Sequence, residues 1–93
     1  MEEPTRAHTI IRGRVQGVSF RAWTTEQANA LAVKGWVRNR LDGSVEAVFE
    51  GGEQAVRQII HAVNVGPRFA LVDDVQVEFQ PPTGEFQTFE IRR

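Results

Sequence analysis

The chain has 93 residues, of which 41% are hydrophobic and 25% charged, and its formal net charge is −1. This length supports one hydrophobic core, and the composition is typical of a globular protein and not of a disordered chain. No apolar run approaches the ~20 residues that span a bilayer, the acidic start lacks the form of a secretory signal, and the chain has no cysteine for disulfides or thiolate chemistry.

The charge is distributed unevenly along the chain. Residues 4–41 carry seven basic side chains and one acid, whereas residues 42–93 carry nine acids and four arginines. A basic segment indicates an anionic ligand, either a nucleic acid or a smaller anion. The alternative is a surface on which both signs intermix once the chain folds, and the charges alone do not decide between the two.

The first half of the chain predicts a strand, a helix and a hairpin. Residues 8–15 alternate between apolar and polar side chains, as a half-buried strand does. From Phe20 the apolar side chains follow a helical spacing, which predicts a helix over residues 21–33. Residues 34–40 and 44–51 predict two strands that are joined by a two-residue Asp-Gly turn.

The second half predicts a helix over residues 51–63, a loop, a strand over 71–79, a turn and a short final strand over 86–93. The order β-α-β-β-α-β favours an α+β fold, the ferredoxin-like split β-α-β sandwich. Its antiparallel sheet has four strands plus the short terminal strand, with two helices on one face. We expect one domain over residues 1–93, with residues 1–6 as a flexible tail.

That topology brings two distant segments together. Right-handed crossovers place the first two strands on either side of the third, and both run in the same direction. Their C-terminal ends then share one edge of the sheet, about 10 Å apart. The loop after residue 15 and the Arg-Asn-Arg segment at 38–40 are therefore expected to converge.

The loop before the first helix has the features of an anion site. It comprises Val15, Gln16, Gly17, Val18, Ser19 and Phe20 and leads into Arg21. A helix start presents unpaired N–H groups, and Gly17 lets the backbone turn so that these groups form an inward-pointing nest. Arg21 is unfavourable by about 0.3–1 kcal/mol at the positive end of the helix dipole, a conflict that a bound phosphate removes. The alternative is an ordinary turn with Arg21 in solvent, and Arg14 is expected on the surface outside the site.

Asn39 ends the second predicted strand. In one interpretation its side chain only forms the turn before Leu41. In the other it holds a water molecule next to a bound phosphoryl group, since a carboxamide donates and accepts hydrogen bonds but takes no proton at neutral pH. No histidine, cysteine or carboxylate pair adjoins either segment.

The segments GRVQGVSFR (13–21) and GWVRNRLDGSVE (35–46) together resemble the acylphosphatase family. The similarity continues through GPRFALVDDV (66–75) to the terminal FEIRR (89–93). It implies hydrolysis of acyl phosphates such as carbamoyl phosphate, 1,3-bisphosphoglycerate or benzoyl phosphate to carboxylate and inorganic phosphate. It further implies that the backbone of residues 15–21 cradles the phosphate, that Arg21 binds it and that Asn39 positions the attacking water. The departures are Ser19, at a variable position, and Ala32, where glycine is frequent.

The resemblance and the residue types also set expectations about partners. A leaving carboxylate whose acid has a pKa of about 4 needs no protonation, so we expect neither a cofactor nor a metal. We expect a cytoplasmic monomer with no nucleic-acid or membrane partner, and inorganic phosphate as product and competitive inhibitor. The alternatives are a regulatory module that binds phosphate or acyl phosphate without turnover, an RNA-binding sheet, and a unit of a larger carbamoyl-phosphate-handling enzyme.

Overall fold

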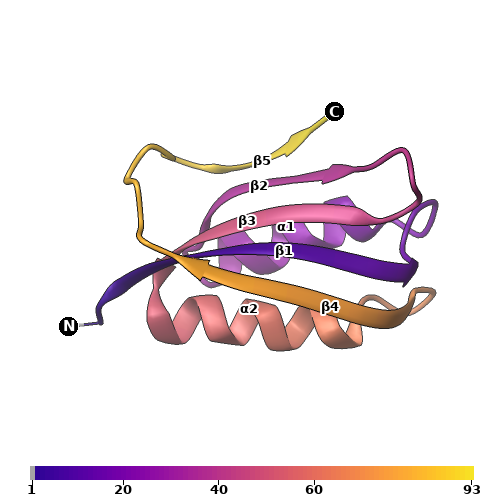
Figure 1. The fold of residues 1–93 in the computed structure, drawn as a ribbon, viewed down its shortest axis with the longest axis horizontal. Coiled ribbons are helices and arrows are strands. Elements are labelled where there is room, and N and C mark those ends of the chain that lie inside the picture. Colours follow the sequence, from indigo (N-terminus) through magenta and orange to yellow (C-terminus); the bar gives the residue numbers. More distant parts are fainter. Residues whose placement is uncertain (1) are drawn as a thin grey trace.

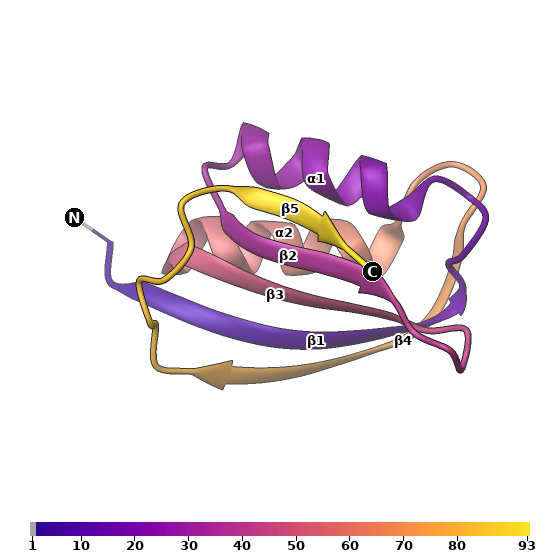
Figure 2. The ribbon, with the colours of Figure 1, turned by 90° about the horizontal axis from the view of Figure 1, so that it is seen from above.

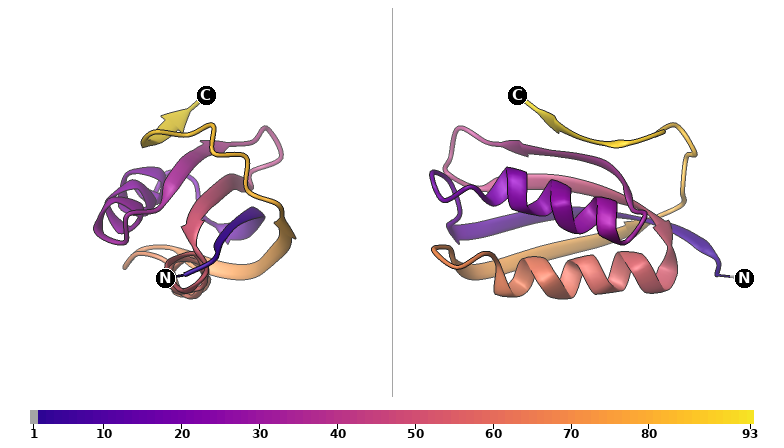
Figure 3. Two further views of the ribbon diagram at one scale, coloured as in Figure 1. Left: turned by 90° about the vertical axis from the view of Figure 1, so that its left-hand side faces the viewer. Right: turned by 180° about the vertical axis from the view of Figure 1, so that it is seen from behind.

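The computed structural model describes residues 2–93, and its elements follow the predicted order (Figure 1). The strands are β1 (Pro4–Arg14), β2 (Lys34–Asn39), β3 (Val45–Gly52), β4 (Leu71–Gln80) and β5 (Phe89–Arg92), and the helices are α1 (Phe20–Ala30) and α2 (Glu53–Val65). The sheet order is β4-β1-β3-β2-β5, and both helices cover one face (Figure 3). The predicted ferredoxin-like α+β class is confirmed. Neither helix among these residues is long and apolar enough to cross a bilayer.

The strand directions bring the C-terminal ends of β1 and β2 to one edge. Both strands pair with β3 and run antiparallel to it, as predicted. By contrast, β5 pairs with β2 in parallel, so the sheet is mixed and not antiparallel throughout. The reason is visible in Figure 1, where the chain crosses from β4 to the opposite edge of the sheet at the end where β2 begins. A strand that starts there must run in the direction of β2.

The core lies between the helices and the sheet, because alternate strand residues face the helices. Its fully buried side chains include Ala7 and Ile11 of β1, Val37 of β2, Ala47 and Phe49 of β3, and Val56, Ile59 and Val63 of α2. The short strand β5 is attached to this core by Phe89, whose ring stacks on that of Phe49 with 5.7 Å between centroids. The side of α2 that was predicted to be apolar is the side that packs against the sheet.

The first helix ends earlier than predicted, at Ala30 instead of residue 33. Ala32 has a left-handed backbone with φ of 57°. The N–H of Ala32 donates to the carbonyl of Asn29, and the N–H of Val33 donates to that of Ala28. This is the Schellman pattern, whose left-handed position glycine usually fills. The sequence predicts a longer helix because Ala32 stands at the position where a glycine would have marked the helix end.

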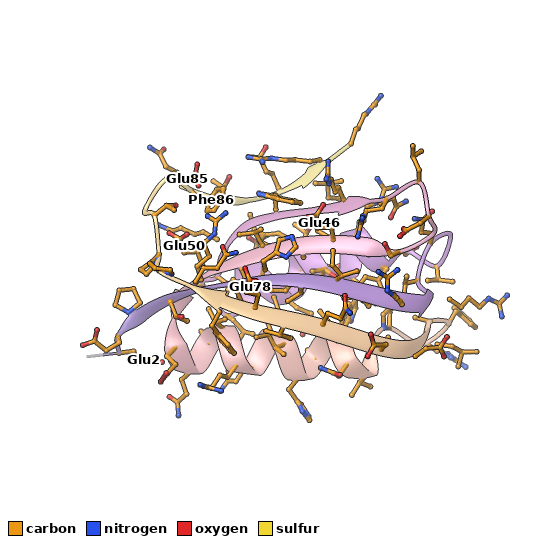
Figure 4. The ribbon with its side chains drawn as sticks, viewed as in Figure 1. Glu2, Glu46, Glu50, Glu78, Glu85 and Phe86 are labelled. Atoms are coloured by element: carbon orange, nitrogen blue, oxygen red, sulfur yellow. The ribbon has the colours of Figure 1, made fainter. Side chains whose placement is uncertain are left out.

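Residues 4–6 belong to β1, so the prediction of a flexible tail is wrong for them; residue 1 lies outside the described residues. The guanidinium of Arg6 lies 3.3 Å from the carboxylate of Glu50 and 3.1 Å from that of Glu85. Figure 4 shows these two glutamates close together where β4 ends. Residues 4–6 are held by strand pairing with residues 50–52 and by the ion pairs of Arg6, partners that lie far away in the sequence and that apolar alternation does not reveal.

The sheet face opposite the helices carries charges of both signs. Glu46 lies there, with 2.6 Å from its carboxylate to His8 Nε2 and 2.6 Å to Arg38 Nε (Figure 4). Burial raises the pKa of Glu46, but the hydrogen bonds from His8 and Arg38 outweigh it and hold the pKa below its usual value of 4.5. A carboxylate with a lowered pKa in the folded state stabilises that state above its unfolded pKa.

We therefore expect the free energy of unfolding to fall as the pH drops through the lowered pKa of Glu46, below about pH 4.5. Glu46→Gln removes this contribution, so its stability deficit relative to the parent is largest at neutral pH and shrinks in acid. Urea unfolding between pH 7 and pH 3 measures it, with Glu26→Gln on the exposed side of α1 as control. A deficit of the same size at every pH would contradict the role assigned to the carboxylate.

Candidate active site

The loop between β1 and α1 forms a backbone concavity at the end of the sheet. Gly17 and Ser19 have φ angles of 75° and 61°, on either side of Val18. Such an alternation of backbone conformations turns successive N–H groups towards one point and forms an anion-binding nest. Because Ser19 has a Cβ, its left-handed backbone costs about 1 kcal/mol, and strain of this kind clusters at functional sites.

Buried side chains hold the loop in this conformation. Val15 and Phe20, which stand at its two ends, are 1% and 2% exposed. Val18 packs partly against the same core, and the rings of Phe20 and Trp23 meet with 5.5 Å between centroids. The loop is thus fixed through its side chains, and its backbone groups remain for other partners.

The first turn of α1 carries uncompensated positive charge. Its N-cap residue, Ser19, makes no side-chain hydrogen bond, and no acidic residue stands in the turn. The N–H of Trp23 bonds to the carbonyl of Ser19 at 3.0 Å, and the N–H groups before it belong to the open start of the helix. Arg21 is half-buried in this turn and forms no ion pair within residues 2–93. Helix dipole and guanidinium therefore both favour an anion here.

The side chain of Gln16 joins this loop to the β2–β3 hairpin. Its Nε2 donates to the carbonyl of Arg40 at 2.8 Å and to that of Ser44 at 2.9 Å. Arg40 directly follows Asn39, so the loop and the end of β2 lie side by side. In Figure 2 the loop, the hairpin and the segment before β4 gather at one end of the molecule. The sequence predicted a role for the backbone of Gln16 alone, and this side-chain role was not predicted.

The hairpin has a three-residue loop instead of the predicted two-residue turn. The N–H of Arg40 donates to the carbonyl of Ser44 at 2.8 Å, and the N–H of Gly43 donates to the carbonyl of Arg40 at 3.2 Å. Gly43 closes the loop with φ of 92°, the arrangement in which a turn is followed by a left-handed glycine. The Asp42 carboxylate accepts hydrogen bonds from the hydroxyl and from the N–H of Ser44. These two bonds, with that of the hydroxyl the stronger cause, lower the pKa of Asp42 to about 2.

Asn39 lies half-buried at the end of β2, opposite Val45. Its side-chain oxygen Oδ1 is buried and has no hydrogen-bond partner among residues 2–93. A buried acceptor without a donor costs about 1–3 kcal/mol. The carboxamide thus keeps an acceptor without a partner at the end of β2, beside the residue that Gln16 contacts.

Two of the cavities along this edge of the sheet include predicted site residues. One has a volume of about 500 Å³ and is lined by Arg38, Asn39, Arg40, Leu41, Asp42 and Arg93. The other has a volume of about 350 Å³ and is lined by Arg14, Gly17, Val18, Ser19 and Phe69. Arg21 lines neither cavity. The structure therefore brings the two predicted segments to one edge, but they line separate cavities.

Arg14 is exposed, as expected, but it lines the loop cavity and so does not lie away from the predicted site. The pairing of β1 with β4 shifts register between Arg12 and Gly13. A bulge of this kind re-aims the side chains beside it and often adjoins a functional site. The signal in the sequence was Gly13, because an isolated glycine inside a strand pattern suggests a bulge.

The polar groups at this edge suit an anion. Within residues 2–93 no three histidine, aspartate or glutamate side chains are placed to hold a metal ion. The groups present are guanidinium ions, backbone N–H groups and the carboxamides of Gln16 and Asn39, together with one carboxylate, that of Asp42, which pairs with Arg12 at 3.3 Å. Together they can bind a phosphoryl group and orient a small polar molecule beside it.

Comparison with known proteins bears out the predicted family resemblance. A family model described as Acylphosphatase matches residues 7–91. An acylphosphatase of Pelotomaculum thermopropionicum is 52% identical over 86 residues, and one of Chloroflexus aurantiacus is 54% identical over 86 residues. Each alignment covers 92% of this chain and 94% of the relative. The crystal structure of the Bacillus subtilis acylphosphatase matches with a TM-score of 0.92 at 36% identity, over 96% of this chain and 99% of that one.

We expect Gln16→Ala to lower the free energy of unfolding by about 1–2 kcal/mol, because two hydrogen bonds between the loop and the hairpin are lost. Urea unfolding measures the change. Gln58→Ala, on the exposed side of α2, is the matched control and is expected to stay within about 0.5 kcal/mol of the parent. Equal stabilities of the two variants would show that the Gln16 bridge contributes nothing.

Proposed function

The chain belongs to the acylphosphatase family and hydrolyses acyl phosphates to a carboxylate and inorganic phosphate; we propose how its residues do so. In this proposal the backbone of residues 15–21 and the guanidinium of Arg21 bind the phosphoryl group, and Asn39 positions the attacking water. The single observation that carries the assignment to Asn39 is its buried and unpartnered Oδ1.

Three features support the phosphate site. The positive φ angles of Gly17 and Ser19 shape a nest, the α1 N-terminus has no side-chain cap among the described residues, and Arg21 has no acidic partner within the same range. Phosphate at a helix N-terminus satisfies the orphan N–H groups and the dipole together. The planar guanidinium adds two parallel donors that match two phosphate oxygens.

The carboxamide of Asn39 supplies position and not basicity. Its Oδ1 accepts one O–H of a water molecule, and the lone pair of that water is then directed at the phosphorus. Because Gln16 ties the loop to Arg40, the water and the phosphoryl group are held at a fixed separation. Holding two reactants in this way removes much of the entropic barrier of a bimolecular step.

The reaction asks little more of the protein. The oxygen of water bonds to phosphorus as the bond from phosphorus to the acyl oxygen breaks, and the electron pair leaves with the carboxylate. The proton of the water passes to an oxygen of the phosphoryl group. No general acid is required, since a carboxylate of pKa about 4 is stable without a proton. Arg21 and the N–H groups stabilise the charge of the transition state.

The finer expectations complete this proposal. The chain acts as one acylphosphatase-like domain and as a cytoplasmic monomer, on substrates such as benzoyl phosphate, carbamoyl phosphate or 1,3-bisphosphoglycerate. Inorganic phosphate competes with them because it occupies the same nest. Release of benzoate and phosphate from benzoyl phosphate by the purified chain tests turnover, and binding without release would favour a regulatory module. Size-exclusion chromatography tests the monomer.

We expect Asn39→Ala to lower kcat about a hundredfold or more, because the water loses its orientation. The inhibition constant of inorganic phosphate stays near that of the parent, since the nest and Arg21 are intact. Steady-state hydrolysis of benzoyl phosphate measures both constants. Asn64→Ala on the exposed side of α2 is the matched control. Hydrolysis by Asn39→Ala at the parent rate would show that Asn39 does not position the water.

Arg21→Ala is expected to lose both activity and phosphate inhibition, each by about a hundredfold, because the phosphoryl group loses its charged donor. Arg21→Lys recovers little of either, since an ammonium ion cannot copy the two parallel N–H donors. The same assay applies, with Arg57→Ala on α2 as control. Phosphate inhibition of Arg21→Ala at the parent inhibition constant would place the phosphate elsewhere.

A further inference from the structure

We propose that the cavity between the 17–19 loop and Phe69 receives the acyl group of the substrate, and that Phe69 favours aromatic over small acyl groups. This inference rests on the proposed phosphate site. It assigns a part of the substrate that neither Arg21 nor Asn39 contacts. Three observations carry it: the order of the elements along the edge, the exposure of Phe69 and the charge of Arg14.

The sheet order places Phe69 and Asn39 on opposite sides of the phosphate loop. Along the edge the order is β4, β1, β3, β2. Asn39 ends β2, the loop follows β1, and β4 begins two residues after Phe69. Leu71, the first residue of β4, pairs with Arg14, the last residue of β1. The loop therefore stands between Asn39 on one side and Phe69 on the other.

The geometry of phosphoryl transfer determines on which side of the phosphate loop the acyl group lies. The attacking and leaving oxygens lie roughly in line on opposite sides of the phosphorus. If the water comes from the side of Asn39, the acyl oxygen leaves towards the opposite side. That side is the cavity of about 350 Å³ that the loop shares with Arg14 and Phe69.

Phe69 is held in this cavity with its ring open to solvent. The residue is 72% exposed, and the guanidinium of Arg68 lies 5.5 Å from the centroid of its ring. The segment that carries it is well fixed, because Ala70 is buried and its N–H donates to the carbonyl of Pro67 at 3.0 Å. Gly66, at the start of this segment, packs close to Phe20, since a Cβ added to Gly66 would lie 3.4 Å from Phe20 Cε2. The segment therefore contacts the residue that ends the phosphate loop.

Arg14 adds charge to the same cavity. It is exposed and forms no ion pair within residues 2–93. As the bond to phosphorus breaks, negative charge develops on the carboxylate that leaves, and a nearby cation stabilises it. The cavity thus offers a cation for the carboxylate and a phenyl ring for the rest of the acyl group.

The hairpin residue Leu41 is the competing contact, because its side chain is fully exposed and lines the other cavity. That cavity includes Asn39, so it lies on the side from which the water attacks. The in-line requirement places the acyl group away from it. Phe69, and not Leu41, is therefore the residue that meets the acyl group.

Steady-state kinetics of Phe69→Ala with two substrates tests this assignment. We expect the KM for benzoyl phosphate to rise about two- to tenfold, the range of one aromatic pair. The KM for acetyl phosphate, which has no ring, and the kcat for both substrates stay near the parent values. Phe69→Leu gives a smaller rise. Phe79→Ala is the matched control, because Phe79 is also exposed beneath an arginine, Arg57, 5.1 Å from its ring centroid.

Two outcomes would overturn the assignment. One is a ratio of the two KM values that is the same in Phe69→Ala and in the parent. The other is an equal rise in both KM values together with the inhibition constant of inorganic phosphate, because Phe69 would then act by shaping the phosphate loop. Neither outcome touches the proposed roles of Arg21 and Asn39, whose failure appears in the phosphate inhibition and kcat of their own variants.

Discussion

The side chain of Gln16 joins the two segments to which the proposed mechanism assigns the phosphate and the attacking water. A carboxamide nitrogen has two hydrogens, and Gln16 uses them on two carbonyls of the β2–β3 hairpin, those of Arg40 and Ser44. The phosphate loop and Asn39 are separated by a strand and a helix in the sequence. The sheet brings the two segments to the same edge, because β1 and β2 both run antiparallel to β3. The Gln16 bridge then fixes the distance between them.

The same fold determines which charged side chains form ion pairs. The acids of the second half of the chain neutralise arginines of the first half outside the phosphate loop. The resulting pairs are Arg6 with Glu50 and Glu85, Arg12 with Asp42, and Arg38 with Glu46. Four basic residues of the first half, Arg14, Arg21, Lys34 and Arg40, are left without an ion pair within residues 2–93, and the first two belong to the segment around the loop. The charges of both signs thus intermix over much of the surface, while the unpaired arginines around the loop are consistent with the proposed anion site.

The features that the sequence predicted are those with a local cause. Apolar periodicity defined the strands and helices, and the crossover rule brought the loop and Asn39 to one edge. The features it missed depend on distant partners. Arg6 is ordered by Glu50 and Glu85, which lie 44 and 79 residues away. The parallel direction of β5 follows from where the chain crosses the sheet, and the exposure of Phe69 is a property of the whole fold.

Three energetically unfavourable features lie together at the proposed site, and a bound ligand would relieve two of them. Ser19 holds a left-handed backbone, Asn39 buries an unpartnered oxygen, and Arg21 stands at the positive end of a helix dipole. Each costs on the order of 1 kcal/mol, which is a sizeable share of the stability of a small domain. In the proposed mechanism a phosphoryl group and a water molecule remove the last two costs. The core that holds Val15 and Phe20 thus carries a strained edge, and the chemistry proposed for that edge needs no residue that changes its protonation state.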